Sequence, residues 1–366
     1  MLGFGTLVHH SERGKETDEV ARIPKIDLES HFFTPEYMAL LERRTRPPRF
    51  EVTDENVRVW LEPSLPDVML THSHHLRNTL LDLSEARIGA MDEAGIAIQF
   101  LSVSSPGFEQ FEEDVQVEHT RKANDALAAF IALHPTRFVG LASLPVSAPH
   151  AASDELERCV TELGFKGANI HSHIGDTYLD DARYFPILDR AARLRVPINL
   201  HPTLPHANML GPYLGYGWAM PGPGLGFGHE TAVHAMRIVY SGTFDKLPDL
   251  QLILGHLGEG LMHWLYRIDF DFNKPWMAKS HRADIARKPS DYLRSNVWYT
   301  CSGNWLDSAL LATIQEVGAD RVMFASDYPW EQIGDGADFI EAAPVDEHDR
   351  RKICHENAAR LFDLAL

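Results

Sequence analysis

Cysteine is rare in this chain of 366 residues. Its three cysteines, Cys159, Cys301 and Cys354, are far apart in the sequence, and no two of them form a C-x-x-C pair. An odd number of cysteines without such spacing excludes a disulfide framework and a thiolate zinc site as leading interpretations. We expect all three to be reduced packing residues.

Long apolar runs and positive charge are also scarce. The first twenty residues, which include the polar run SERGKE at 11–16, lack the apolar stretch of a signal peptide, and no later run has the length of a membrane helix. Lys and Arg together number 34 against 52 Asp and Glu, which gives a formal net charge of −18. The sequence therefore predicts a cytoplasmic protein without a membrane or nucleic-acid partner, because phosphate binding needs clustered basic residues.

Motifs of two large enzyme groups are missing as well. The chain has no G-x-x-x-x-G-K-[ST] phosphate loop, no G-x-G-x-x-G before a helix and no G-x-S-x-G nucleophile elbow. Nucleotide-dependent and serine-hydrolase functions therefore have no support in the sequence.

What the sequence does contain is a series of short apolar runs separated by segments long enough for helices. This alternation is typical of repeated βα units around a parallel sheet, and eight runs predict a (β/α)8 TIM barrel. The expected strands cover residues 25–28, 98–103, 139–143, 167–170, 197–200, 252–254, 297–300 and 322–325, and amphipathic helices are expected at 117–133, 152–163, 184–194, 231–241 and 306–317.

Three segments fall outside this repeat. Residues 1–22 are expected to form an N-terminal extension, and residues 23–366 to form one barrel domain. Within that domain, segments 32–83 and 202–229 are too long to be simple connections. We expect both to be insertions over the C-terminal face of the barrel, where they would shape a pocket.

Acidic and histidine residues follow several expected strands. Glu29 and His31 follow the first strand, His201 the fifth and Asp327 the eighth. The C-terminal ends of barrel strands meet on one face, so these side chains are expected to converge there. Two carboxylates and two imidazoles favour zinc or manganese over magnesium or calcium, and no organic cofactor is indicated. Each residue alone has an ordinary alternative, namely a hydrogen-bonded core histidine or a salt-bridged acid.

Other residues are candidates for proton transfer or substrate binding. His256 and Glu259 follow the sixth strand and could pair with each other or with a substrate proton. Arg267 could anchor a substrate carboxylate or simply pair with a nearby acid such as Asp269. Aromatic candidates for packing on a substrate ring, each of which could instead be a core residue, are Trp60, Trp218 and Phe227.

Seven segments in order resemble the amidohydrolase-related decarboxylases. They are LESHF with TPE at 28–36, RIGAMDEAGI at 87–96, LHP at 200–202, His234 with Ser241-Gly242, LILGHLGEG at 252–260, SDYPWE at 326–331 and NAARLF at 357–362. The resemblance runs from about Lys25 to Phe362. It implies that Glu29, His31, His201 and Asp327 bind the metal and that His256 with Glu259 assists proton handling.

The resemblance points to two branches of that group. The Glu-Ser-His start is similar to the branch acting on dihydroxybenzoates, whereas Ser172-His173 with Gly175 and Tyr178 is similar to the carboxyvanillate branch. His173 is therefore a further candidate for substrate binding, and a homo-oligomer, dimer or tetramer, is expected.

The resulting hypothesis is non-oxidative decarboxylation of an ortho-hydroxylated aromatic carboxylic acid, in which Asp327 protonates the ring carbon. The alternative is a metal-dependent hydrolase of a lactone, amide or ester on the same barrel, with Asp327 as general base. A third, less favoured hypothesis is a barrel kept for binding or assembly without catalysis.

Overall fold

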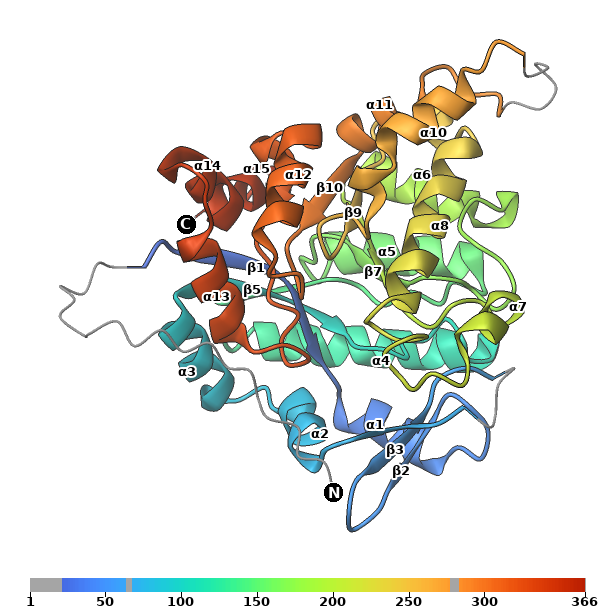
Figure 1. Cartoon of the computed structure of the whole chain (residues 1–366). Helices are drawn as coiled ribbons and strands as arrows, with labels where there is room; N and C mark the ends of the chain where they lie inside the picture. The colour runs from blue at the N-terminus through green and yellow to red at the C-terminus, as the bar shows by residue number, and fades with distance from the viewer. Residues whose placement is uncertain (1–21, 64–67, 277–282, 366) are drawn as a thin grey trace, which may run out of the picture.

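The core of the fold contains eight parallel strands. The computed structural model describes residues 22–63, 68–276 and 283–365, so the predicted extension lies almost entirely outside the described residues. The strands are β1 (Lys25–Phe32), β5 (Ile96–Val103), β6 (Phe138–Gly140), β7 (Ala168–His171), β8 (Ile198–His201), β9 (Leu252–Leu254), β10 (Val297–Thr300) and β11 (Val322–Met323). Figure 1 shows β1, β5, β7, β9 and β10 among the helices that cover them.

These strands form two parallel sheets that close into one barrel. The sheet orders are β1-β5-β6 and β7-β8-β9-β10-β11. A bridge between Ala142 and Ala168 joins β6 to β7, and a bridge between Ser30 and Tyr328 joins β1 to the segment after β11. The predicted TIM barrel is confirmed, with a strand at each of the eight expected places.

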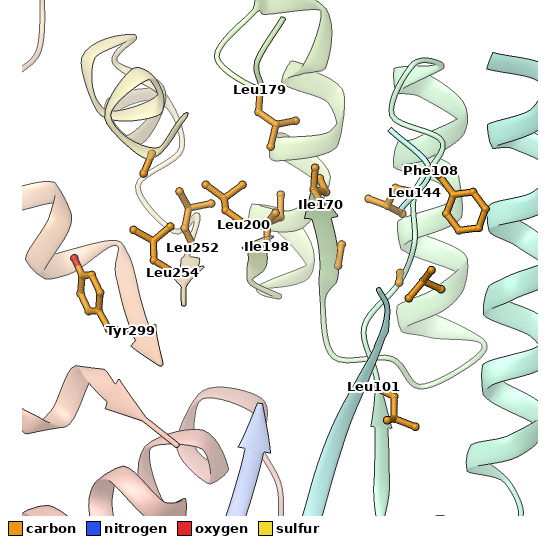
Figure 2. Close-up of a cluster of buried hydrophobic side chains, with 14 of the residues drawn as sticks. Leu101, Phe108, Leu144, Ile170, Leu179, Ile198, Leu200, Leu252, Leu254 and Tyr299 are labelled. Carbon is orange, nitrogen blue, oxygen red and sulfur yellow. The ribbon is translucent and has the colours of Figure 1, made fainter. Parts of the chain in front are cut away.

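Side chains alternate along the regular strands between the helical layer and the barrel interior. Figure 2 shows Ile198 and Leu200 of β8 beside Leu252 and Leu254 of β9, and all four are fully buried. These apolar side chains pack on the surrounding helices. The intervening positions are left for the interior, and His201 is one of them.

Helices follow the strands as the amphipathic patterns predict. They are α3 (Glu85–Ala94), α4 (Glu113–Ile131), α5 (Pro149–Thr161), α6 (Phe185–Leu194), α8 (Gly226–Tyr240), α9 (Thr243–Lys246), α10 (Leu265–Phe272), α11 (Pro289–Ser295), α12 (Asp307–Val317), α13 (Ile333–Ala342), α14 (Glu347–Arg351) and α15 (Asn357–Phe362). No helix among the described residues is long and apolar enough to cross a membrane.

The two long segments contain their own secondary structure. The first begins at the C-terminal end of β1 and forms a small antiparallel sheet with a helix on either side of it in the sequence (Figure 1). Its elements are α1 (Pro35–Arg43), β2 (Arg49–Val52), β3 (Val57–Trp60), β4 (Leu70–His72) and α2 (His74–Leu81). The second follows β8 and contains α7 (Ala207–Leu210) and a 3-10 turn, Gly211–Tyr213. The last residues of the expected insertion at 202–229 belong to α8, which begins at Gly226.

The packing of α5 on the barrel gives a test of the fold. Leu156 of α5 is fully buried. Leu156→Ala is expected to lower the free energy of unfolding by about 2–5 kcal/mol, because it removes apolar contacts and leaves a cavity. Urea unfolding of the metal-free protein measures the change. The matched control is Leu133→Ala at a position that is 73% exposed, where a change within about 0.5 kcal/mol is expected. Equal losses in the two variants would contradict the assignment of this core.

Candidate metal centre

Four side chains from three parts of the chain meet at the C-terminal end of the barrel. Glu29 and His31 come from β1, His201 from the end of β8, and Asp327 from the segment after β11. One ligand atom of each lies within 4.8 Å of the others. His31 Nε2 is 3.1 Å from both His201 Nε2 and Asp327 Oδ1, and Glu29 Oε1 is 3.5 Å from His201 Nε2. The structure thus brings together the four residues that the strand-end pattern selects.

The arrangement of their polar atoms suits a divalent transition ion. Glu29 Oε1 is buried and has no hydrogen-bond partner among the residues that the structure describes. His201 Nδ1 donates to the carbonyl of Pro202 at 2.8 Å, so its Nε2 carries a lone pair toward His31. A buried carboxylate oxygen without a hydrogen-bond partner, beside an imidazole nitrogen with a lone pair, is a donor set that a cation would complete.

Electrostatics hold two of these groups in the form that binds a metal. Burial lowers the pKa of His201 well below its usual value, and the nearby His31 lowers it further, so the imidazole is neutral. For Asp327, burial alone would raise the pKa. The neighbouring His256 and His31 outweigh burial and hold the pKa of that carboxyl well below its usual range. A neutral imidazole and an ionised carboxylate are the ligand forms.

The backbone at Asp327 is unusual for a residue with a side chain. Its φ of 62° lies in the left-handed region. This conformation costs a non-glycine residue on the order of 1–3 kcal/mol. Two main-chain hydrogen bonds hold the segment against β1, from Asp327 N to Glu29 O at 2.9 Å and from His31 N to Tyr328 O at 2.7 Å. The same contacts that close the barrel therefore place Asp327 beside the β1 ligands.

His256 and Glu259 form a pair next to this cluster. His256 Nδ1 is 2.9 Å from Glu259 Oε1, and His256 Nε2 is 3.9 Å from Asp327 Oδ2. Burial would lower the pKa of His256, but the carboxylates of Glu259 and Asp327 raise it well above its usual value. Gly303 makes room for this ring, because a Cβ there would lie 3.2 Å from His256 Cδ2. The pair can hold a proton close to Asp327.

Among the aromatic candidates for substrate binding, Phe227 is next in sequence to a residue that lies close to this pair. It precedes Gly228, where a Cβ would lie 2.7 Å from Glu259 Oε2. Trp218 packs edge-on to Phe227, with ring centroids 5.8 Å apart. Trp60 lies on β3 in the inserted sheet, 8% exposed, with the Arg49 guanidinium 3.4 Å from its ring centroid.

The two polar candidates for substrate binding occupy different places. His173 is buried, and its Nδ1 lies 3.1 Å from Gln110 Nε2. Gln110 lines a cavity of about 530 Å³ next to the first insertion. Arg267 is 72% exposed on α10, with its Nε 3.5 Å from Asp271 Oδ2. The structure therefore places Arg267 on the surface, away from the four-residue cluster of this chain, in the kind of ion pair with a nearby acid that is its ordinary alternative.

Several supporting residues are absent from the sequence-based site. Ser302 Oγ donates to Glu29 Oε2 at 2.6 Å, and Thr300 Oγ1 lies 3.3 Å from the same oxygen. Thr300 ends β10 and Ser302 follows it, so both lie where the strand-end pattern places site residues. No feature of the sequence identifies them as partners of Glu29.

A second histidine–carboxylate pair, Glu109 with His171, adjoins the cluster. His171 is the last residue of β7, and its ring lies 4.8 Å from that of His201. Its Nδ1 is 3.2 Å from Glu109 Oε2. Glu109 comes from the loop after β5, and no motif links it to a strand on the far side of β6.

Comparison with known proteins gives a consistent result. The sequence profile of the amidohydrolase family (Amidohydro_2) matches residues 26–364. The chain is 42% identical over 296 residues to a gamma-resorcylate decarboxylase from Polaromonas sp. strain JS666, which covers 79% of this chain and 90% of that protein.

Two solved structures share the fold over almost the whole length. One is a dihydroxybenzoic acid decarboxylase from Polaromonas sp. JS666 with bound manganese and the inhibitor 2-nitroresorcinol. It has a TM-score of 0.80 and 38% identity, and the match covers 93% of this chain and 97% of that one. The other is 5-carboxyvanillate decarboxylase from Sphingomonas paucimobilis, with a TM-score of 0.84, 30% identity and coverage of 94% and 100%. The chain belongs to the amidohydrolase family.

Proposed function

We propose that this protein is a metal-dependent carboxy-lyase that decarboxylates an ortho-hydroxylated aromatic carboxylic acid. The observation that carries the proposal is the position of Asp327, which belongs to the four-residue cluster and also lies 3.9 Å from the paired His256. One carboxylate can therefore help to hold an ion and deliver a proton beside it. The relatives named as decarboxylases of hydroxybenzoates support the choice of substrate class.

The cofactor in this proposal is one divalent transition ion, manganese or zinc, held by Glu29, His31, His201 and Asp327. A related structure contains manganese, and the mixed carboxylate and imidazole donors suit either ion. When bound, the ion supplies a Lewis-acidic centre that orients a substrate and neutralises its negative charge.

The chain's own residues account for the proton transfer. Decarboxylation breaks the bond between the ring and the carboxylate and forms a carbon–hydrogen bond, so it needs one proton and no oxidant. Asp327 is the proposed donor to the ring carbon. Asp327 is ionised at rest, so it must first accept a proton, and the proposed source is His256, which holds one because Glu259 and Asp327 raise its pKa. A positioned acid of this kind contributes about 10²–10⁴-fold to a rate.

Loading of the metal depends on Glu29. Burial raises the pKa of this carboxyl, and the neighbouring Asp327 carboxylate raises it further, although His256, His31 and a hydrogen bond from Ser302 oppose the shift. Because a metal binds the carboxylate and not the acid, protons compete with the ion at this residue.

We also propose that the chain forms a homo-oligomer, a dimer or a tetramer. Large aromatic side chains on and beside α10 are exposed to solvent, among them Trp264 at 60%, Tyr266 at 81% and Phe270 at 50%. Exposed apolar groups gathered on one element are typical of protein–protein contact surfaces.

The reaction has a direct test. The protein loaded with Mn²⁺ is expected to release carbon dioxide from 2,6-dihydroxybenzoate or another ortho-hydroxybenzoate without oxygen. Asp327→Asn is expected to lower kcat by at least about 10²-fold, because the amide cannot donate the proton. Leu133→Ala, on the exposed surface, serves as the control. Turnover of lactones or esters with no release of carbon dioxide from any ortho-hydroxybenzoate would replace this proposal with the hydrolase.

Metal affinity is expected to depend on pH with a defined sign. As pH falls through the raised pKa of Glu29, Mn²⁺ affinity should weaken by up to about tenfold per pH unit for each proton displaced. Manganese titrations followed by electron paramagnetic resonance measure the affinity at each pH. Glu29→Gln should bind Mn²⁺ more weakly and with a shallower pH dependence. An affinity that stays constant as the wild type is acidified would argue against Glu29 as a ligand.

The oligomer can be measured by sedimentation equilibrium. The wild type is expected to have a mass that is a multiple of the 41.2 kDa chain. Tyr266→Glu should shift the mass toward the monomer, because it places a charge on the apolar face. Leu133→Ala, on another exposed surface, should keep the wild-type mass. A wild type that sediments as a monomer would contradict the oligomer and leave the proposed reaction intact.

A further inference from the structure

Strand β1 contains a bulge at the metal ligands. Asp27 pairs with Gln99 of β5, but the next pair along the strand is Ser30 with Leu101. Two residues of β1, one of them Glu29, therefore stand opposite a single residue of β5. A bulge adds local twist and re-aims the side chains around it. Here it contains Glu29, and only Ser30 separates it from His31, so it affects the direction of both β1 ligands.

The Asp27 side chain spans this bulge and is fully buried. Its Oδ2 accepts from Ser30 Oγ at 2.7 Å and from Gln99 Nε2 at 3.1 Å, on the two sides of the distorted pairing. Its Oδ1 also accepts from the main-chain N–H of Glu29 at 3.3 Å. The carboxylate thus accepts hydrogen bonds from donors that the bulge has moved out of the regular β-sheet pairing.

The same carboxylate reaches the other end of the chain. Ser326 donates to Asp27 twice, from its main-chain N–H to Oδ1 at 2.8 Å and from Oγ to Oδ2 at 2.6 Å. Ser326 directly precedes Asp327, whose left-handed backbone needs surrounding contacts to persist. One side chain therefore binds both the bulge that carries Glu29 and the segment that carries Asp327.

A buried arginine strengthens the β1 side of this arrangement. Arg87 is 1% exposed, and it donates to Gln99 Oε1 at 3.1 Å and to the carbonyl of His31 at 2.8 Å. Gln99 is therefore held from both ends, by Arg87 and by Asp27. The network leaves little freedom for β1 at the ligands.

We propose that Asp27 is a positioning residue of the metal centre, which fixes the distance and orientation of the Asp327 carboxylate relative to Glu29 and His31. Asp27 acts through the bulge and through Ser326, and it is not a ligand. The inference rests on the metal site and not on the identity of the reaction. The competing explanation is that Asp27 only ties the first strand to the last and contributes stability alone.

Lys25 provides a matched control on the same strand. It is also fully buried, and its Nζ lies 2.5 Å from Glu341 Oε1 on α13. Like Asp27, it ties β1 to the C-terminal part of the chain, but it lies before the bulge. Lys25→Met removes a buried tie of this kind without touching the ligand segments.

The experiment compares Asp27→Asn, Ser326→Ala and Lys25→Met in the full chain. Asp27→Asn keeps the shape but turns an amide donor toward groups that already donate. We expect it to weaken Mn²⁺ binding by about 10–100-fold and to change the electron paramagnetic resonance spectrum of the bound ion, because outer residues orient the ligands. Ser326→Ala should change both readouts in the same direction but less, since the main-chain bond remains. Lys25→Met should lower the melting temperature of the metal-free protein and leave Mn²⁺ affinity and spectrum as in the wild type.

Two outcomes would overturn the proposal. One is an Asp27→Asn protein with wild-type Mn²⁺ affinity and spectrum, whatever its stability. The other is a Lys25→Met protein that loses as much Mn²⁺ affinity as Asp27→Asn. If Asp27→Asn does not fold, Ser326→Ala decides the question with the same two readouts. Because manganese binding is measured without substrate, absence of decarboxylation in the wild type would remove the proposed function and leave this inference standing.

Discussion

The structure depends on one electrostatic constraint: two imidazoles and the Glu29 carboxylate are buried, and the partly buried Asp327 carboxylate lies within a few ångström of them. Glu29 is 3% exposed and His31 fully buried, and Glu29 Oε1 finds no donor among the described residues. Buried charge without a partner is costly, and a divalent cation at this point offsets the cost for both carboxylates. Metal binding and the stability of this end of the barrel are therefore coupled.

Closure of the barrel supplies the geometry for that cluster. Glu29 and Asp327 are almost three hundred positions apart, yet a main-chain bond joins them directly. The bulge in β1 and the left-handed backbone at Asp327 are both local departures from regular structure. Such departures persist where surrounding contacts determine them, and Asp27 supplies several of those contacts. In the proposed reaction this rigidity keeps the proton donor and the ion in a fixed relation.

Much of the fold and part of the site could be predicted from local patterns. The apolar runs predict all eight barrel strands, because a strand buried on both faces needs a continuous apolar segment. The histidines and acids after those strands predict which side chains meet. Arg267 shows the limit of such patterns, since a cationic residue on a helix has the same local sequence pattern whether its side chain faces a pocket or the solvent. The start of α8 at Gly226 shows a second limit of local patterns, because a glycine-rich segment predicts a loop until its packing is known.

The sequence by itself determined the barrel, the family resemblance and the set of residues able to hold an ion, because strand periodicity and residue chemistry are local properties. Only the tertiary structure decided how those residues are supported. The roles of Asp27, Ser302 and Glu109 arise from contacts between segments distant in sequence, and no spacing along the chain encodes them. For Asp27, the register of β1 against β5 fixes these contacts, and register is a property of pairing rather than of any one strand.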